Sequence, residues 1–142
     1  MKKLITIILF CFIAFTAISQ EKEEQKFFKI KTLGVTSSEM LEHNVWSNWL
    51  EWTKTNVLIT LDITANQIII YGKTKNTFDI IEYQNNYTDD DGDEWIGFKT
   101  IDDDGMKVEI RHITMTENNG DVYKQICFDY KSYRILYYID TQ

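Results

Sequence analysis

The stretch that decides the fold is Val57-Leu58-Ile59-Thr60-Leu61-Asp62-Ile63-Thr64, in which an apolar series alternates with a more polar one. A period of two places successive side chains on opposite faces of a β-strand. Residues 106–113 and 133–140 alternate in the same way. Each of these segments is therefore expected to form a half-buried strand of an antiparallel sheet, with one face on the core and one in water.

Working outward from these segments, strands joined by short links cover most of the chain. The links contain Gly or Asn, as in Ala65-Asn66 and Asp102-Asp103-Asp104-Gly105, which suits hairpins with a residue at positive φ. Only 84–93 is longer, and residues 37–45 could form one helical turn opened by a serine cap. The expected strands lie near residues 27–33, 45–53, 56–63, 67–72, 77–83, 94–101, 106–113, 121–129 and 132–139.

These strands, linked by hairpins in chain order, predict an all-β fold: an antiparallel up-and-down meander of about 8–9 strands. Such a meander must close into a small barrel or fold into a two-layer sandwich, because open edge strands invite pairing with other chains. The absence of proline suits a sheet in which nearly every amide is paired. A chain of 142 residues is the size of one domain, and we expect a single β domain over residues 27–142.

The N-terminal residues 1–19 have the pattern of a signal peptide. Lys2 and Lys3 precede an almost unbroken apolar run, and small residues lead up to an expected cleavage site near Ser19 and Gln20. The alternative is an uncleaved anchor, but the apolar run is short for a membrane span. We therefore expect a secreted or periplasmic protein with no membrane span after cleavage, in which residues 20–26 form a flexible lead-in.

The charge balance excludes one class of partner. The chain has 15 Lys and Arg against 22 Asp and Glu, and removal of residues 1–19 leaves 13 basic side chains and a net charge of −9. A protein that binds the phosphate backbone of nucleic acid needs a basic surface, so no nucleic-acid partner is expected. Cleavage also leaves Cys127 as the one cysteine, so no internal disulfide can form.

An acidic loop around Gly92 is a candidate metal site. Asp89, Asp91 and Asp93 alternate there, and calcium binds where several oxygens converge on a sharp loop. The full twelve-residue calcium-loop spacing is absent, since the closing position holds Thr100, and the alternative is a solvated turn. The predicted metal ligands are thus Asp89, Asp91 and Asp93 with calcium, and no other cofactor is expected.

Aromatic side chains are the second candidate site. Trp46, Trp49 and Trp52 fall within seven residues, and Tyr83 lies on a neighbouring expected strand. On a regular strand Trp46 and Trp52 share a face, and Trp49 points to the other, where it is the best candidate for an exposed contact. Aromatic surfaces bind apolar ligands, sugars or peptides, although small barrels also fill their cores with such residues. Trp46, Trp49, Trp52 and Tyr83 are the predicted ligand-binding residues.

No enzyme machinery is evident in the sequence. The expected mature chain has two histidines, His43 and His112, and His112 shares an apolar strand face with Val108 and Ile110. A nucleophile elbow, a phosphate loop and a paired-cysteine zinc site are all absent from the sequence. Cys127 with one histidine is a weak basis for a nucleophilic dyad. We therefore expect a protein without catalytic activity.

Trp49-Leu50-Glu51-Trp52, the alternating segments 57–62, 67–71 and 78–81, and the later turn at 102–105 resemble small exported all-β proteins of unknown function. The resemblance covers most of residues 45–139 and implies a single meander domain, with no activity attached. A calycin-like barrel is an architectural analogy only, because the Gly-x-Trp opening typical of lipocalins is not present before Trp46.

The sequence thus predicts an exported, non-catalytic β-domain that binds a small ligand, a surface polysaccharide or a protein partner through aromatic and acidic side chains. One alternative is a calcium-dependent binding module that uses the acidic loop 88–94. Another is an inhibitor of a secreted hydrolase, for which 84–93 is the one long loop that could enter an active site.

Overall fold

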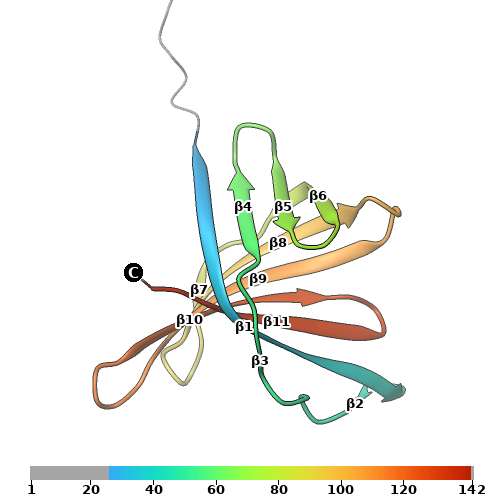
Figure 1. Cartoon of the computed structure of the whole chain (residues 1–142). Helices are drawn as coiled ribbons and strands as arrows, with labels where there is room; N and C mark the ends of the chain where they lie inside the picture. Colours follow the sequence, from blue (N-terminus) through green and yellow to red (C-terminus); the bar gives the residue numbers. More distant parts are fainter. Residues whose placement is uncertain (1–25, 142) are drawn as a thin grey trace, which may run out of the picture.

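The computed structural model describes residues 26–141, and every regular element in that range is a β-strand (Figure 1). The strands are β1 (Phe27–Glu42), β2 (Val45–Trp46), β3 (Thr53–Lys54), β4 (Leu58–Asp62), β5 (Gln67–Tyr71), β6 (Lys75–Tyr83), β7 (Tyr87–Thr88), β8 (Glu94–Asp102), β9 (Lys107–Thr116), β10 (Val122–Asp129) and β11 (Tyr133–Ile139). The all-β prediction is confirmed. The expected signal peptide lies outside the described residues, as does most of the lead-in.

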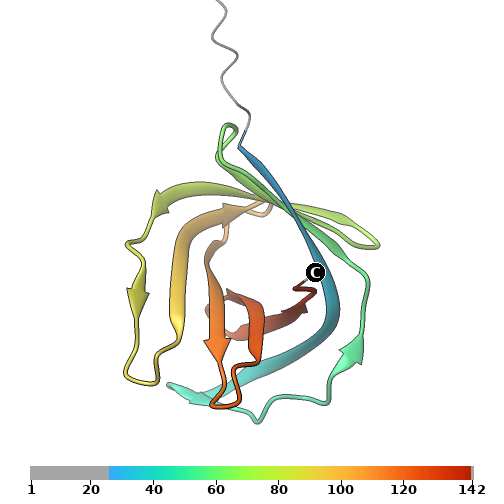
Figure 2. The same ribbon diagram turned by 90° about the vertical axis from the view of Figure 1, so that its left-hand side faces the viewer.

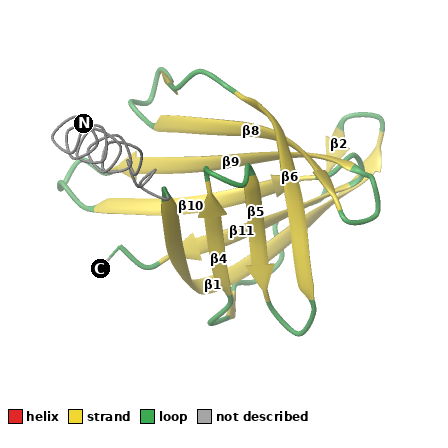
Figure 3. Ribbon diagram, turned by 90° about the horizontal axis from the view of Figure 1, so that it is seen from above, coloured by secondary structure: helices red, strands yellow, loops and turns green. Residues whose placement is uncertain are grey.

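Eight of these strands close into an antiparallel barrel. In chain order β1, β4, β5, β6, β8, β9, β10 and β11 each pair with the next, and β11 pairs back with β1. Figure 2 shows the resulting ring, and Figure 3 shows β8, β9 and β10 crossing β4, β5 and β6 on the other side of it. The meander is therefore confirmed, and of the two expected closures the barrel is correct.

The barrel interior is filled by the alternating apolar residues that the sequence pattern picked out. Ile59 and Ile110 are fully buried, and the rings of Phe78 and Phe128 meet at 5.1 Å between centroids. Aromatic and branched side chains thus pack against one another in the centre of the barrel, as in other small barrels.

The possible helical turn at 37–45 is wrong. β1 continues as a strand to Glu42, and the chain then reverses at Asn44, which has a φ of 61°. Alternate hydroxyls explain the extended conformation. Thr36 Oγ1 donates to the carbonyl of Leu50 at 2.6 Å, and Ser38 Oγ donates to the carbonyl of Ser47 at 2.8 Å. These contacts reach the returning segment, residues 45–57, only if β1 is extended.

The prediction of one continuous strand at 45–53 is also wrong. The returning segment follows the edge of β1 but carries extra residues. Val35 pairs with Thr53 and Met40 with Trp46, so five steps along β1 lie opposite seven steps along the returning segment. Regular pairing survives only in the short strands β2 and β3. The extra residues form an irregular segment outside the barrel ring.

A register shift between Thr32 and Gly34 changes which side chains of β1 face inward. Thr32 lies opposite Ile139, whose side chain is in the core, whereas Gly34 lies opposite Tyr138, whose side chain points to the other face. Beyond the shift, Gly34, Thr36 and Ser38 therefore lie on the outside of the barrel. The small residues Gly34, Thr36 and Ser38 thus lie beside the returning segment.

The free loop within residues 84–93 is shorter than the sequence suggests. Tyr87 pairs with Trp95 and Thr88 with Glu94, so β7 folds back on β8. The rings of Tyr87 and Trp95 stack at 5.8 Å with an interplanar angle of 6°. The remaining tight turn, 89–93, is held against the outer face of the barrel.

Candidate functional site

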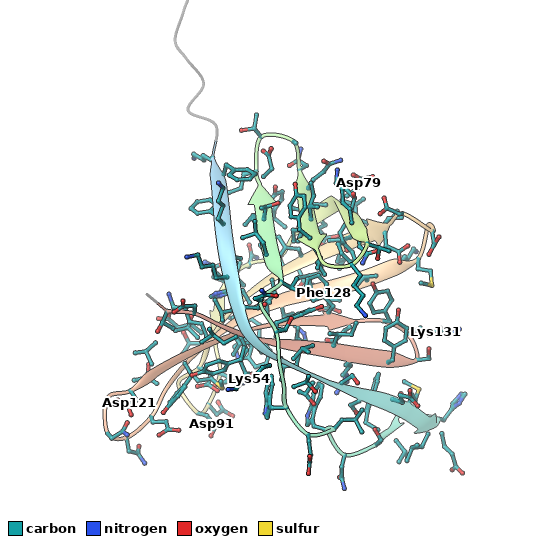
Figure 4. All side chains as sticks on the ribbon, in the orientation of Figure 1. Lys54, Asp79, Asp91, Asp121, Phe128 and Lys131 are labelled. Atoms are coloured by element: carbon teal, nitrogen blue, oxygen red, sulfur yellow. The ribbon has the colours of Figure 1, made fainter. Side chains whose placement is uncertain are left out.

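Two adjoining cavities form a groove on the outer face of the barrel. The larger, of about 680 Å³, lies between Asp91, Asp93 and residues 115–119, and the smaller, of about 490 Å³, lies beside Trp52 and Lys54. Gln125 and Tyr138 line both cavities, so these two residues form the floor where the cavities meet. Figure 4 labels Asp91, which lines the larger cavity, and Lys54, which lines the smaller one, on the same side of the molecule. The groove is thus elongated and open to solvent.

Three aromatic rings follow one another along this groove. Trp52 meets Tyr138 with 6.3 Å between ring centroids, and Tyr138 meets Tyr123 at 6.1 Å. The rings are not coplanar, since the interplanar angles are 76° and 47°. They therefore line a trough, with ring edges and faces exposed in turn, and they do not form a flat platform.

Gly34 explains how Trp52 reaches this position from the far side of β1. A Cβ at Gly34 would lie 3.4 Å from Cε3 of Trp52 and 3.6 Å from the carbonyl oxygen of Thr53. The indole packs beside Gly34 and meets Tyr138, which lies opposite Gly34 on β11. The register shift in β1 is what turns Gly34 toward this face.

A partly buried ladder of alternating aromatic and charged groups crosses the same face. The guanidinium of Arg134 lies 3.7 Å from the ring centroid of Trp46, and its Nε lies 3.0 Å from Oδ1 of Asp129. Arg111 pairs with Oδ2 of Asp129 and lies 5.4 Å over the ring of Trp95. The ladder ties β2, β11, β10, β9 and β8 together. The central carboxylate of the ladder is mostly shielded from water, because the Asp129 side chain is 14% exposed.

The acidic loop is organised by Asp89. Its Oδ1 accepts hydrogen bonds from the amides of Asp91 and Asp93 at 3.1 and 2.9 Å, and its Oδ2 accepts one from Trp95 Nε1 at 2.8 Å. The bond from Trp95, with the amide bonds, lowers the pKa of Asp89. Desolvation and the neighbouring charges of Asp89 and Asp91 raise the pKa of Asp93. Asp89 therefore shapes the turn, whereas Asp91 and Asp93 line the larger cavity.

The second acidic turn has the same geometry at the other end of β8. Oδ1 of Asp102 accepts from the amides of Asp104 and Met106 at 3.0 and 2.8 Å, and Gly105, like Gly92, has a positive φ. In both turns the first aspartate acts on its own backbone, as Asx turns do.

Within residues 26–141, no group of three or more His, Cys, Asp or Glu is arranged to hold a metal ion. Calcium binding by Asp89, Asp91 and Asp93 stays a prediction. Asp89 would have to exchange existing hydrogen bonds for metal bonds, because both of its oxygens already accept donors.

The four predicted aromatic residues do not gather in one place. Trp46 and Trp52 lie on the same face, as the sequence predicts, with Trp46 on Arg134 and Trp52 in the groove. Trp49 is 45% exposed and lines neither of the two cavities that form the groove. Tyr83 lies elsewhere: its hydroxyl donates to Oδ1 of Asn66 at 2.9 Å, and its ring packs edge-on to Phe98.

His112 and Cys127 do not form a dyad. His112 lies opposite Ile126, whose side chain is in the core, so Cys127, the next residue on β10, points to the outer face. Burial, with the nearby charge of Lys124, lowers the pKa of His112. Burial raises the pKa of the Cys127 thiol, which the charges of Arg111 and Arg134 only partly offset.

Sequence reasoning did not single out Tyr123, Gln125 and Tyr138 as a site. The period of two does place Tyr123 and Gln125 on one face of β10, and that signal was available. The position of Tyr138 beside Trp52 depends on the register shift in β1, which the sequence pattern does not reveal.

Comparison with known proteins gives no relative: no family model, no curated protein and no solved structure matches the chain. Helices long and apolar enough to cross a membrane are absent from residues 26–141. The resemblance to small exported all-β proteins therefore stays a prediction.

Proposed function

We propose that this protein is an exported, non-catalytic binding domain, and that the groove on the outside of its barrel holds an extended polar ligand. The observation that carries the proposal is the row of rings Trp52, Tyr138 and Tyr123, which lines two adjoining cavities. Trp52 is 51% exposed although its ring contacts Tyr138 and lies beside Gly34. Exposed aromatic side chains in a concave, polar-rimmed surface are typical of recognition sites.

The elongated shape favours a chain-like ligand over a compact one. Each of the two cavities is within the usual range for ligand sites, and they share Gln125 and Tyr138 as a common floor. The side-chain amide of Gln125 supplies both a hydrogen-bond donor and an acceptor beside the rings. A ligand that spans the groove gains ring contacts at both ends and hydrogen bonds in the middle.

The test is a binding screen against a hexapeptide library and an oligosaccharide array, with Trp52→Ala and Trp49→Ala as matched variants. Both tryptophans are about half exposed on the same segment, but only Trp52 lines the groove. We expect ligands that bind wild type and Trp49→Ala alike and bind Trp52→Ala about tenfold more weakly, as loss of one aromatic contact implies. Equal loss in both variants, or no ligand in either collection, would refute the proposal.

A further inference from the structure

We propose that the larger cavity of the groove receives a lysine or arginine side chain from an extended peptide. This inference rests on the proposed function, since it assigns the chemistry of the ligand that the groove holds. Three observations carry it: the tilt of the aromatic rings, the charge of the cavity walls, and the different character of the smaller cavity.

The ring tilt favours a cation. Tyr123 and Tyr138, the two rings that line the larger cavity, are inclined by 47° to each other, and Trp52 in the smaller cavity is inclined by 76° to Tyr138. A pyranose ring stacks best on a flat aromatic face, and the groove offers no pair of coplanar rings for two successive sugars. Two tilted rings can both turn a negative face toward the same cation, and aromatic side chains attract cations through that face.

The walls of the larger cavity are acidic. Asp91, Asp93 and Glu117 line it, and no lysine or arginine is among the described residues that do so. Glu117 and Asp121 lie close enough to the Tyr123 phenol that their charges raise its pKa. A cation that enters between the rings and these carboxylates is attracted by both.

The other end of the groove has a different character, which suits a peptide. Lys54 lines the smaller cavity with Trp52 and Leu33, and its walls are more apolar. A peptide presents side chains of different chemistry along one backbone, whereas an amino-sugar polymer repeats one positive charge in every unit. The acidic cavity and the cavity with Lys54 therefore match the former better.

The acidic cavity is built in advance of the ligand. Trp95 holds Asp89 by a hydrogen bond of 2.8 Å, Asp89 holds the amides of Asp91 and Asp93, and Arg111 covers Trp95. Fixed walls reduce the ordering that binding must impose, which favours affinity.

The experiment is an NMR titration of the ¹⁵N-labelled protein at physiological salt, where long-range attraction is screened. The probe is the end-blocked peptide Gly-Ser-Lys-Gly-Ser, compared with the same peptide carrying Nε-acetyl-lysine. We expect the lysine peptide to shift the amide signals of Tyr123, Gln125 and Tyr138, and the acetylated peptide to bind at least fivefold more weakly.

The matched variants are Asp91→Asn and Asp104→Asn. Each removes one charge, and the two residues hold the same place in turns with the same hydrogen bonds, at opposite ends of β8. We expect Asp91→Asn to weaken the lysine peptide at least threefold and Asp104→Asn to leave it unchanged. Equal weakening by both variants would show mere attraction to an acidic chain and would overturn the proposal.

Two further outcomes separate this inference from the proposed function. If a neutral ligand from the screen binds in a Trp52-dependent way while the lysine and acetyl-lysine peptides bind equally, the groove is a binding site but its cation specificity is wrong. Binding of a glucosamine hexamer without binding of the lysine peptide would likewise overturn the peptide assignment. If no ligand of either kind binds, both proposals fail.

Discussion

Asp129 is the residue on which the outer-face ladder depends. It is the one carboxylate between Arg111 and Arg134, and both guanidiniums are shielded by tryptophan rings. Its removal leaves two cations close together and without a partner. The pair at Glu82 and Lys99 is a useful contrast, because both of those side chains are about half exposed.

We therefore predict that Asp129→Ala lowers the free energy of unfolding by about 2 kcal/mol, less than for a fully buried pair because the arginines are partly exposed. Glu82→Ala should change it by less than about 0.5 kcal/mol, as for most surface pairs. Urea unfolding curves for both variants check this. Similar losses in the two variants would mean that the ladder adds nothing beyond an ordinary surface ion pair.

Much of the barrel could be predicted at the residue level, and the groove could not. Period-two alternation locates Ile59 and Ile110 in the core, and Asn66 and Gly105 take the positive φ angles expected of turns. The position of Trp52 depends on a register shift and on the extra residues of the returning chain. Both features arise from pairing between strands, so no local pattern records them.

At the scale of elements, β1 and the returning segment form one long hairpin held by side-chain hydroxyls. Thr32, Thr36 and Ser38 are each nearly fully buried, and each donates to a carbonyl of the segment 47–57. These bonds replace the ladder that the extra residues interrupt. The hydroxyls of Thr36 and Ser38 satisfy the carbonyls of Leu50 and Ser47, whereas the carbonyl of Val57 also accepts the amide of Thr32 at 3.2 Å.

Thr36→Val tests this arrangement, since valine keeps the shape of threonine and removes its hydroxyl. We predict a loss of about 1–2 kcal/mol in stability, because the carbonyl of Leu50 loses its donor. Faster hydrogen exchange at Leu50, whose amide donates to Ser37, should accompany it. Thr77→Val is the control, because the half-buried Thr77 hydroxyl makes no hydrogen bond within residues 26–141. An equal loss there would rule out the hydrogen bond as the cause.

At the scale of the whole molecule, stability should depend on pH through His112 near neutrality. Burial and Lys124 lower the pKa of this imidazole below its ordinary value of 6.5, so the folded protein prefers the neutral form. The unfolded chain binds the proton more readily. Stability is therefore fully present above pH 6.5 and declines as the pH falls through and below that value.

His112→Gln should remove this part of the pH dependence. We expect wild type to lose more stability than the variant between pH 7.5 and 5.5 in urea unfolding. Asp93, with a raised pKa, acts in the opposite sense as the pH falls, so the comparison must be made between the two proteins. Parallel curves would show that His112 is hydrated in the folded protein.

The pairing of β1 with β11 has a consequence for how the protein is made. Thr32 lies opposite Ile139, so the first barrel strand to be synthesised waits for the last before its free edge is covered. During that interval the growing chain presents an unpaired strand that could join a neighbouring molecule. Because closure needs contacts between distant parts of the chain, folding is expected to be slow and to follow complete synthesis. For a chain that crosses a membrane before it folds, such a delay keeps it in a form that can still be threaded.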